Sequence, residues 1–307
     1  MADQSQNKAV QTTGHAWDGD LQEFNNPLPS WWLWAFYASI AFAAIYWVLY
    51  PAWPVGDTYT KGVMTTTFKD SKGNEVTTGW NTRAEFIKDM QSGDEALKQQ
   101  AYLKKVSAAS YAEIAADPDM TAFAQSMAKV LFADNCAACH GVGGTPATIG
   151  NYPNLRDDSW LWGGSIDRIN QTIRNGRLGY MPPFKSVLSK TQIAQLASYV
   201  LSLSGHQVDA AMAKAGDALF HGDEAGCHYC HTNSGKGLHS QGSANLTDQI
   251  WTVADVPDAP TPAAKLAAVE HVIQSGIQRR MPAWQGRLSN DQIKLLTVYV
   301  HGLGGGQ

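Results

Sequence analysis

The sequence of 307 residues has little charge and little cysteine, and each scarcity narrows the possible functions. Charged residues make up 16% of the chain, and the formal net charge is −4. No basic field is therefore available to bind a nucleic acid. The hydrophobic fraction of 44% is ordinary for a chain that buries real cores, and the length predicts about two domains. Only four cysteines occur, and all four belong to two copies of one short motif.

Charge is absent altogether from residues 31–50, which read WWLWAFYASIAFAAIYWVLY. At the rise of an α-helix, this run crosses the ~30 Å hydrocarbon layer of a membrane. A buried core helix is the alternative, but aromatic residues crowd both ends of the run, as they do at membrane interfaces. We expect one transmembrane helix.

The residues before this helix do not resemble a cleaved signal peptide. They are polar and include Asp18, Asp20 and Glu23, whereas a signal peptide begins with a short basic region. We therefore expect an uncleaved anchor. Basic residues close to the helix are too few for the positive-inside rule to orient it.

An internal repeat dominates the rest of the chain. Its first half recurs at a constant offset of 91 residues, from Cys136/Cys227 to Trp160/Trp251, and its second half at 100, from Ile173/Ile273 to Leu203/Leu303. The nine additional residues of the second copy fall in a proline-rich segment, where a surface loop can grow at small entropic cost.

Each copy predicts three helices and no convincing strand. In the first copy, Asp117 with Pro118, Ser165 and Ser189 are N-terminal cap signals, and Gly176 and Gly205 are stop signals. In the second copy, the same starting roles fall to Thr261 with Pro262 and to Ser289. Domains of this size often depend on a cofactor for part of their core.

The cysteine motif has the spacing Cys-x-x-Cys-His in both copies. Its residues are Cys136, Cys139 and His140, and Cys227, Cys230 and His231. Disulfide pairs, a zinc site and covalent haem attachment compete as interpretations. Redox Cys-x-x-Cys pairs give no reason for the histidine, and paired zinc knuckles are usually separated by ~15–20 residues. The spacing suits two thioether bonds to one haem with the histidine as an axial ligand, so we expect two covalently bound haem c groups.

Methionine supplies the best sixth ligand for each iron. Met281 is the only methionine after the second motif, and the repeat register pairs it with Met181, although Met212 is a rival by composition. Both are followed by proline, which restricts the preceding residue to extended conformations. No other histidine recurs in both copies. Because both axial positions would be filled, we expect electron carriers and no catalytic residue.

The predicted fold is all-α, with one N-terminal transmembrane helix followed by two tandem class I cytochrome c domains. Covalent haem c attachment occurs outside the bacterial cytoplasmic membrane, so the haem domains should be periplasmic and the N-terminus cytoplasmic. The expected segments are a cytoplasmic N-terminal segment (1–30), the anchor (31–50), a periplasmic connector (51–116), and cytochrome c domains at 117–205 and 206–307. Within the connector, we expect Phe86, Met90, Leu97, Leu103 and Val106 to share one loose apolar face of a helical stretch.

The run GHAWDGDLQEFNNPLPSWWLW, the two cysteine motifs, PNLRDDSWLWGGS and the Met-Pro loops resemble the dihaem subunit, CcoP or FixP, of cbb-type cytochrome c oxidases. The resemblance implies an inner-membrane respiratory oxidase that reduces oxygen and pumps protons. It implies that this chain passes electrons from a periplasmic cytochrome c donor to a monohaem cytochrome subunit and a catalytic subunit with b-type haem and copper. It also implies ligation by His140 with Met181 and by His231 with Met281.

Two departures from the resemblance are visible. The segment WLWGG, which begins at Trp160, has no counterpart at Trp251, where the chain reads WTVAD, and we do not expect the additional N-terminal transmembrane helix that some relatives have. The alternatives are a tethered dihaem cytochrome that serves another oxidoreductase, a dihaem peroxidase, and a haem-based gas sensor. Two matched Met-Pro loops argue against the peroxidase, which needs an iron that can open, and the chain has no room for a signalling domain.

Overall fold

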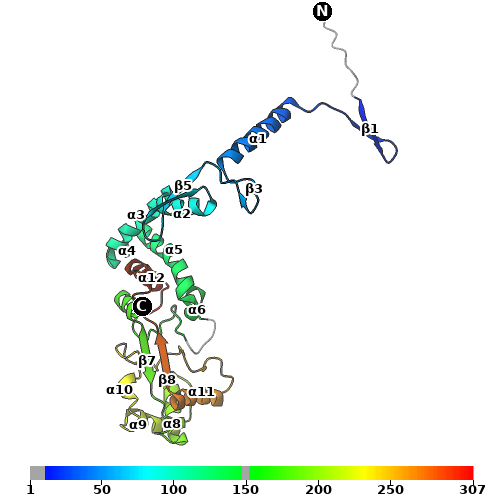
Figure 1. Cartoon of the computed structure of the whole chain (residues 1–307). Helices are drawn as coiled ribbons and strands as arrows, with labels where there is room; N and C mark the ends of the chain where they lie inside the picture. Colours follow the sequence, from blue (N-terminus) through cyan, green and yellow to red (C-terminus); the bar gives the residue numbers. More distant parts are fainter. Residues whose placement is uncertain (1–10, 147–151, 307) are drawn as a thin grey trace, which may run out of the picture. The chain divides into compact units, whose positions relative to one another are not determined.

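The computed structural model describes residues 11–146 and 152–306, and most of its regular structure is helical (Figure 1). The chain forms two compact units, Met1–Ala101 and Tyr102–Gln307. The first unit contains the apolar helix, and the second contains both cysteine motifs.

The apolar helix α1 (Ser30–Leu49) follows a hairpin of β1 (Thr12–Trp17) and β2 (Leu21–Phe24). It is apolar on all sides, and none of its side chains is buried. A helix that is hydrophobic all round belongs either in a protein core or in a membrane. Since α1 is not covered by protein, its length and composition fit a membrane span, one residue earlier than the sequence predicts.

The connector contains strands that the sequence did not predict. Its elements are β3 (Pro54–Val55), β4 (Thr58–Tyr59), β5 (Thr65–Lys69), β6 (Glu75–Gly79), α2 (Thr82–Ser92) and α3 (Asp94–Ala108). The single apolar face predicted here is wrong, because Gly93 separates α2 from α3 and adopts an extended conformation. Phe86 and Met90 are exposed, whereas Val106 is buried near the end of α3.

The second unit is built mainly from helices. They are α4 (Tyr111–Ala116), α5 (Pro118–Asn135), α6 (Ala137–His140), the 3-10 turn η1 (Val142–Gly144), α7 (Ile166–Asn175), α8 (Lys190–Leu203), α9 (Ala210–His221), α10 (His228–His231), α11 (Pro262–Ser275) and α12 (Asn290–His301). Of these, α5, α7, α8, α11 and α12 begin at the predicted positions. Asp117, Ser165, Ser189, Thr261 and Ser289 all cap helices with their side chains, as predicted.

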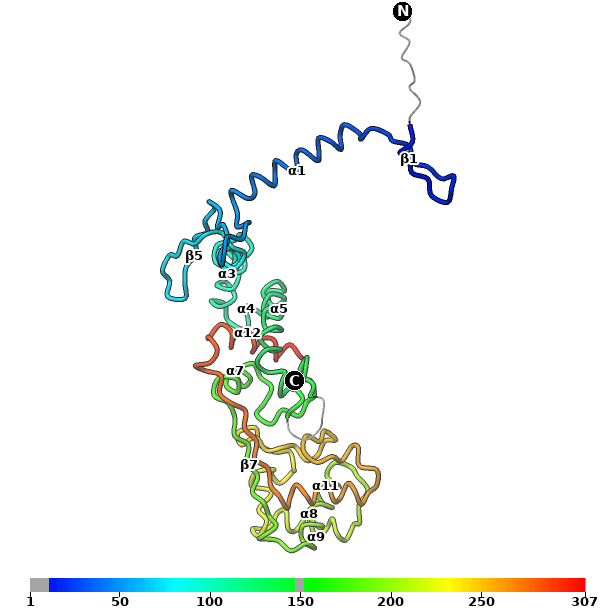
Figure 2. The backbone as a smooth tube through the Cα atoms, turned by 45° about the vertical axis from the view of Figure 1, so that its right-hand side comes forward, coloured from blue at the N-terminus to red at the C-terminus, as the bar shows by residue number. Residues whose placement is uncertain are grey.

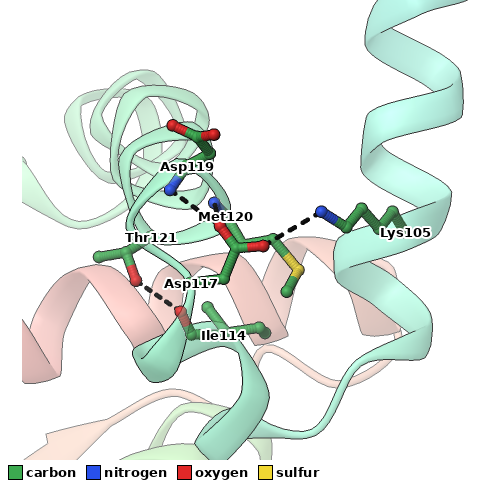
Figure 3. Close-up of polar contacts among 6 residues, drawn as sticks. All are labelled: Lys105, Ile114, Asp117, Asp119, Met120 and Thr121. Atoms are coloured by element: carbon green, nitrogen blue, oxygen red, sulfur yellow. Dashed lines mark hydrogen bonds and ion pairs between the residues drawn. The ribbon is translucent and has the colours of Figure 1, made fainter.

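Figure 3 shows how α5, the helix that leads to the first motif, begins. The Asp117 carboxylate accepts hydrogen bonds from the backbone N–H groups of Asp119 and Met120, at 3.0 and 3.1 Å. Lys105 Nζ donates to the same carboxylate at 3.1 Å, and the Thr121 hydroxyl donates to the carbonyl of Ile114 at 2.6 Å. Side-chain capping by Asp117 and its ion pair with Lys105 therefore both stabilise the first turn of α5.

A two-stranded ribbon joins the two repeats, so the prediction that they contain no strand is wrong. The strands β7 (Arg177–Met181) and β8 (Ile277–Met281) are antiparallel, with Arg177 opposite Met281 and Met181 opposite Ile277. Each strand has only five residues, and its partner lies about 100 residues away in the chain. The predicted methionines therefore lie at opposite ends of one ribbon.

The last helix of each repeat packs against the other repeat. Helix α8 contacts α9 and α11, whereas α12 contacts α5 and α7. Two views show α12 beside α5, at the opposite end of the ribbon from α8, α9 and α11 (Figures 1 and 2). We call this arrangement the helix exchange. It creates two apolar cores, one with α5, α7 and α12 and one with α8, α9 and α11.

Candidate functional site

Both cysteine motifs line a single cavity of about 610 Å³, a volume typical of cofactor pockets. All eight residues that the sequence predicts as cofactor ligands contribute to its wall. They are Cys136, Cys139, His140, Met181, Cys227, Cys230, His231 and Met281. The structure therefore gathers into one place residues that span 146 positions of the chain.

Each motif forms a single helical turn. In the first copy the backbone N–H of His140 donates to the carbonyl of Cys136 at 2.9 Å, and in the second copy His231 donates to Cys227 at 2.9 Å. The helical turn places the two cysteines and the histidine of each motif side by side. One cysteine of each pair is half-buried and the other is exposed.

A backbone carbonyl fixes the orientation of each motif histidine. His140 Nδ1 lies 3.1 Å from the carbonyl oxygen of Pro153, and His231 Nδ1 lies 2.9 Å from that of Ala244. A carbonyl only accepts hydrogen bonds, so Nδ1 carries the proton and Nε2 keeps its lone pair for a metal. This backbone contact is the usual support of a metal-binding histidine. Burial lowers the pKa of both histidines, which favours the neutral ligand form.

The four cysteines are all free, although the disulfide interpretation would pair them. Burial raises the pKa of the Cys136 and Cys227 thiols to about 11. A structural zinc site requires four ligands, and any cysteine among them binds as the thiolate. Within residues 11–146 and 152–306, no group of three or more His, Cys, Asp or Glu side chains is placed to hold a metal ion. The donor set therefore fits thioether attachment better than zinc.

The two methionines lie near the motif of the opposite repeat. Met281 packs on the core of α5, α7 and α12, together with Cys136. Met181 packs on the core of α8, α9 and α11, together with Cys227. The resemblance pairs His140 with Met181, which follows the order of the chain. The packing instead places Met281, not Met181, in the core that contains Cys136.

Two arginines that the sequence interpretation missed also line the cavity. Arg177 lies over the ring of Trp162, with its guanidinium carbon 4.8 Å from the centroid. Arg279 donates to the carbonyl of Thr252 at 2.9 Å. Burial lowers the pKa of both guanidinium groups. Their positions in the segments before the two Met-Pro pairs are the signal that could have identified them.

Trp162 also accounts for the unmatched WLWGG segment. A Cβ atom on Gly242 would meet the Trp162 ring, so this indole lies directly against the loop that follows the second motif. Trp162 of the first repeat thus covers part of the second repeat. The second repeat has no indole at the equivalent position, so it does not cover the first repeat in the same way.

A helical unit with two Cys-x-x-Cys-His turns around an apolar cavity is the architecture of a c-type cytochrome. Residues 9–57 match the family described as the N-terminal domain of cytochrome oxidase-cbb3, FixP. Residues 124–200 and 211–300 match cytochrome c oxidase, cbb3-type, subunit III.

Relatives of known name extend this similarity to nearly the whole chain. The chain is 44% identical to the cbb3-type cytochrome c oxidase subunit FixP of Azorhizobium caulinodans, over 96% of this chain and 94% of that protein. It is 38% identical to the CcoP subunits of Azospirillum brasilense, over 97% and 96%, and Cereibacter sphaeroides, over 96% and 95%. The chain belongs to the CcoP/FixP family of cbb3-type cytochrome c oxidase subunits.

Proposed function

We propose that this chain is the electron-relaying cytochrome c subunit of a cbb3-type oxidase and that it holds two haem c groups. The observation that carries the proposal is the duplicated site. In both motifs a carbonyl fixes the histidine at Nδ1, so that Nε2 keeps its lone pair for a metal, on the wall of one apolar cavity that two methionines also line.

The residues fit two haem groups. Cys136 and Cys139 would hold one group by thioether bonds, with Cys227 and Cys230 holding the other. His140 and His231 would bind the iron through Nε2, and Met181 and Met281 would bind it through their thioether sulfurs. A haem bound in this way exchanges one electron between Fe(II) and Fe(III), and a methionine ligand raises its reduction potential.

Polar groups in the wall also fit this cofactor. Trp251 lines a smaller cavity beside the second motif, and its buried Nε1 has no hydrogen-bond partner among the described residues. A haem propionate would supply an acceptor. Arg177 and Arg279 place positive charge on the wall of the larger cavity, where it would stabilise the same carboxylates.

With a histidine and a methionine on each iron, neither iron would have an open position for a substrate, which supports a role in electron transfer. The apolar side chains around the motifs would limit the access of water to the iron and would favour its less charged state. The electrons would come from a periplasmic cytochrome c and leave for the monohaem and catalytic subunits. Dioxygen would be reduced in the catalytic subunit.

The same proposal assigns the segments of the chain. Residues 1–30 are cytoplasmic, residues 31–50 anchor the chain in the inner membrane, and residues 51–116 connect the anchor to the periplasmic haem region. The ranges 117–205 and 206–307 each contribute one attachment motif. Helix α1 supports the anchor by its length and its composition.

Purification of the full chain from membranes in a mild detergent tests this proposal. We expect two haem c groups per chain by the pyridine haemochrome assay, and the catalytic subunit should copurify. Replacement of both cysteines of either motif by alanine should remove one haem and leave the other. A chain without covalent haem, or one that copurifies with a different oxidoreductase and no oxidase subunit, would refute the proposal.

A further inference from the structure

The end of the apolar helix α1 is joined to the connector by backbone hydrogen bonds. The N–H of Val63 donates to the carbonyl of Val48 at 3.2 Å. The N–H of Met64 donates to the carbonyl of Leu49 at 3.0 Å. Both carbonyls belong to the last turn of α1, where they have no partner within the helix. The chain beyond α1 is therefore attached to the end of the helix at a second place, thirteen or more residues after the helix ends.

A glycine and two aromatic contacts complete this junction. Gly62 has a φ of +72°, and a Cβ atom there would meet the carbonyl of Leu49, so only glycine permits the close approach. Trp47 of α1 contacts Trp53 edge-on, with ring centroids 4.6 Å apart. Tyr50 contacts Trp80 in the same way at 4.9 Å. The start of the connector is thus held at the level of the last turn of α1.

A short hairpin lies within this junction, and Figure 1 shows it beside the end of α1. Its strands β3 and β4 have two residues each, and they pair around Gly56 and Asp57. The N–H of Thr60 extends the ladder by donating to the carbonyl of Trp53 at 2.8 Å. A hairpin of this size is not stable by itself in water, so it needs a surface to pack against.

The hairpin leaves its apolar side chains open. Trp53, Val55 and Tyr59 are 50%, 57% and 55% exposed, and Val63 in the junction is 68% exposed. Because side chains alternate along a strand, Trp53 and Val55 lie on one face of the hairpin and Tyr59 lies on the other. Apolar groups therefore point outward on both faces.

The next hairpin of the same unit has the opposite construction. The exposed outer face of β5 and β6 carries Thr67 and Thr77, whose hydroxyls lie 2.8 Å apart. On the inner face, the buried Thr66 donates to the carboxylate of Glu85 in α2 at 2.9 Å. A hairpin that faces water in this unit thus has a polar outer face. The apolar faces of β3 and β4 indicate a different environment.

From these contacts we propose that the β3–β4 hairpin lies in the interfacial layer of the lipid bilayer, with Trp53, Val55 and Tyr59 at the boundary of headgroups and acyl chains. The proposal rests on the membrane anchorage proposed above. A helix of 20 residues is ~30 Å long and needs its whole length to cross the hydrocarbon layer. Its last turn then lies at the edge of that layer, and the contact with Trp47 places Trp53 at the same depth.

The composition of the segment fits this layer. Tryptophan and tyrosine are enriched where a bilayer meets water, because their rings are apolar and carry one polar group. The only charged residues between Tyr50 and Met64 are Asp57 and Lys61, and both are exposed. Their charges can therefore stay among the headgroups. Interfacial anchors of this kind set the tilt and the rotation of a membrane helix, so the hairpin would fix the direction in which the connector leaves the membrane.

Fluorescence quenching at introduced cysteines tests the proposal. The full-length chain with its haem is placed in lipid nanodiscs, which leave both membrane faces open to the solution. The native cysteines would be held in thioether bonds, so an added cysteine is the only free thiol. Fluorophores at Val55→Cys and Tyr59→Cys should be quenched several-fold more by lipids with a nitroxide near the headgroup than by aqueous iodide. Ser71→Cys, in the turn of the β5–β6 hairpin, is the matched control and should show the reverse.

A label within α1 distinguishes failure of this inference from failure of the anchorage. Ala44→Cys should be quenched by nitroxide lipids whether or not the hairpin touches the membrane. Iodide quenching at Val55 and Tyr59, with Ala44 protected from iodide, would overturn the inference alone. Iodide quenching at Ala44 would refute the anchorage and the inference together.

The same labels in the purified oxidase distinguish lipid from protein as the covering surface. Nitroxide lipids should still quench the labels at Val55 and Tyr59. Protection of both labels from nitroxide lipids and from iodide would assign the hairpin to a contact with another subunit, which would overturn its placement in lipid.

Discussion

At the residue scale, the two motifs differ in the position that follows the histidine. The first copy has Gly141 there and the second has Thr232, with φ of 73° and 63° and ψ of 163° and 164°. This region of backbone space is almost exclusive to glycine and costs about 1–3 kcal/mol for other residues. Thr232 therefore stores backbone strain beside a proposed ligand.

We expect Thr232→Gly to raise the free energy of unfolding by about 1 kcal/mol, because part of the relieved strain is offset by the greater entropy of glycine in the unfolded chain. The reciprocal change, Gly141→Thr, should destabilise the protein, since its Cβ would meet the carbonyl of Thr145. Chemical denaturation of both variants provides the measurement. Equal effects of the two substitutions in the same direction would contradict the strain argument.

The cap of α5 predicts a dependence of stability on acid pH. The pKa of Asp117 is lowered from 3.8, first because its carboxylate accepts the backbone N–H of Met120 and then because it binds Lys105. A carboxyl group whose pKa is lower in the folded state stabilises the fold above its unfolded pKa. This contribution disappears as the pH falls through the folded value.

Asp117→Asn should remove this part of the acid dependence, because the amide oxygen can still cap the helix but carries no charge. Asp117→Ala should also destabilise the protein at neutral pH, since the cap is lost. Unfolding curves recorded from about pH 2 to pH 6 measure both effects. Asp119→Asn, in the same turn, is the control, and an acid dependence unchanged by Asp117→Asn would show that the pair contributes nothing.

At the element scale, the helices were predictable and the ribbon was not. Asp117, Ser189 and Ser289 act through groups only two or three residues away, so the local sequence contains the whole signal. The strands β7 and β8 instead depend on partners about 100 residues distant. The repeat register identified Met181 and Met281 as equivalent, but equivalence says nothing about which repeat each one joins.

Glycine makes the crossing of the ribbon possible. Gly176 has a φ of +67°, and its Cβ would meet the carbonyl of Met281, while Gly276, at +66°, lies equally close to the carbonyl of Met181. A side chain at either position would push a methionine strand out of place. These two glycines therefore couple the backbone of each helix end to the proposed ligand of the other repeat.

Gly176→Ala should destabilise the protein by more than the ~1–3 kcal/mol that this backbone conformation alone costs a residue other than glycine. Gly205→Ala is the matched control, since its φ is +83° but nothing lies within 4 Å of the added Cβ. Thermal unfolding measures both costs, and the spectrum of Gly176→Ala should reveal a weakened methionine ligand. If both variants lose the same stability, the close approach of the ribbon is unimportant.

At the scale of the whole molecule, the helix exchange means that one sequence repeat does not correspond to one apolar core. A tandem duplication predicts two independent domains, yet the described part of the chain places both motifs in one compact unit, Tyr102–Gln307. The motifs, the equivalence of the two methionines and the starts of five helices were evident from the sequence. The sequence did not predict which of these elements share a core. The apolar faces of α8 and α12 are similar, so either helix could pack beside either motif.

The proposed topology gives the last prediction, which concerns the orientation of the chain in the membrane. Helix α1 carries no acidic residue in its first turn and no basic residue in its last turn, so charges within it do not select a direction. Covalent attachment of haem c outside the cytoplasmic membrane requires the motifs, and with them everything after residue 50, to face the periplasm. Protease added to intact spheroplasts should therefore digest the haem-carrying region, and a tag at the N-terminus should stay protected until the membrane is opened. A cytoplasmic enzyme that remains intact shows that the spheroplasts are sealed. Protection of the haem region under those conditions would place the motifs on the cytoplasmic side and contradict the topology.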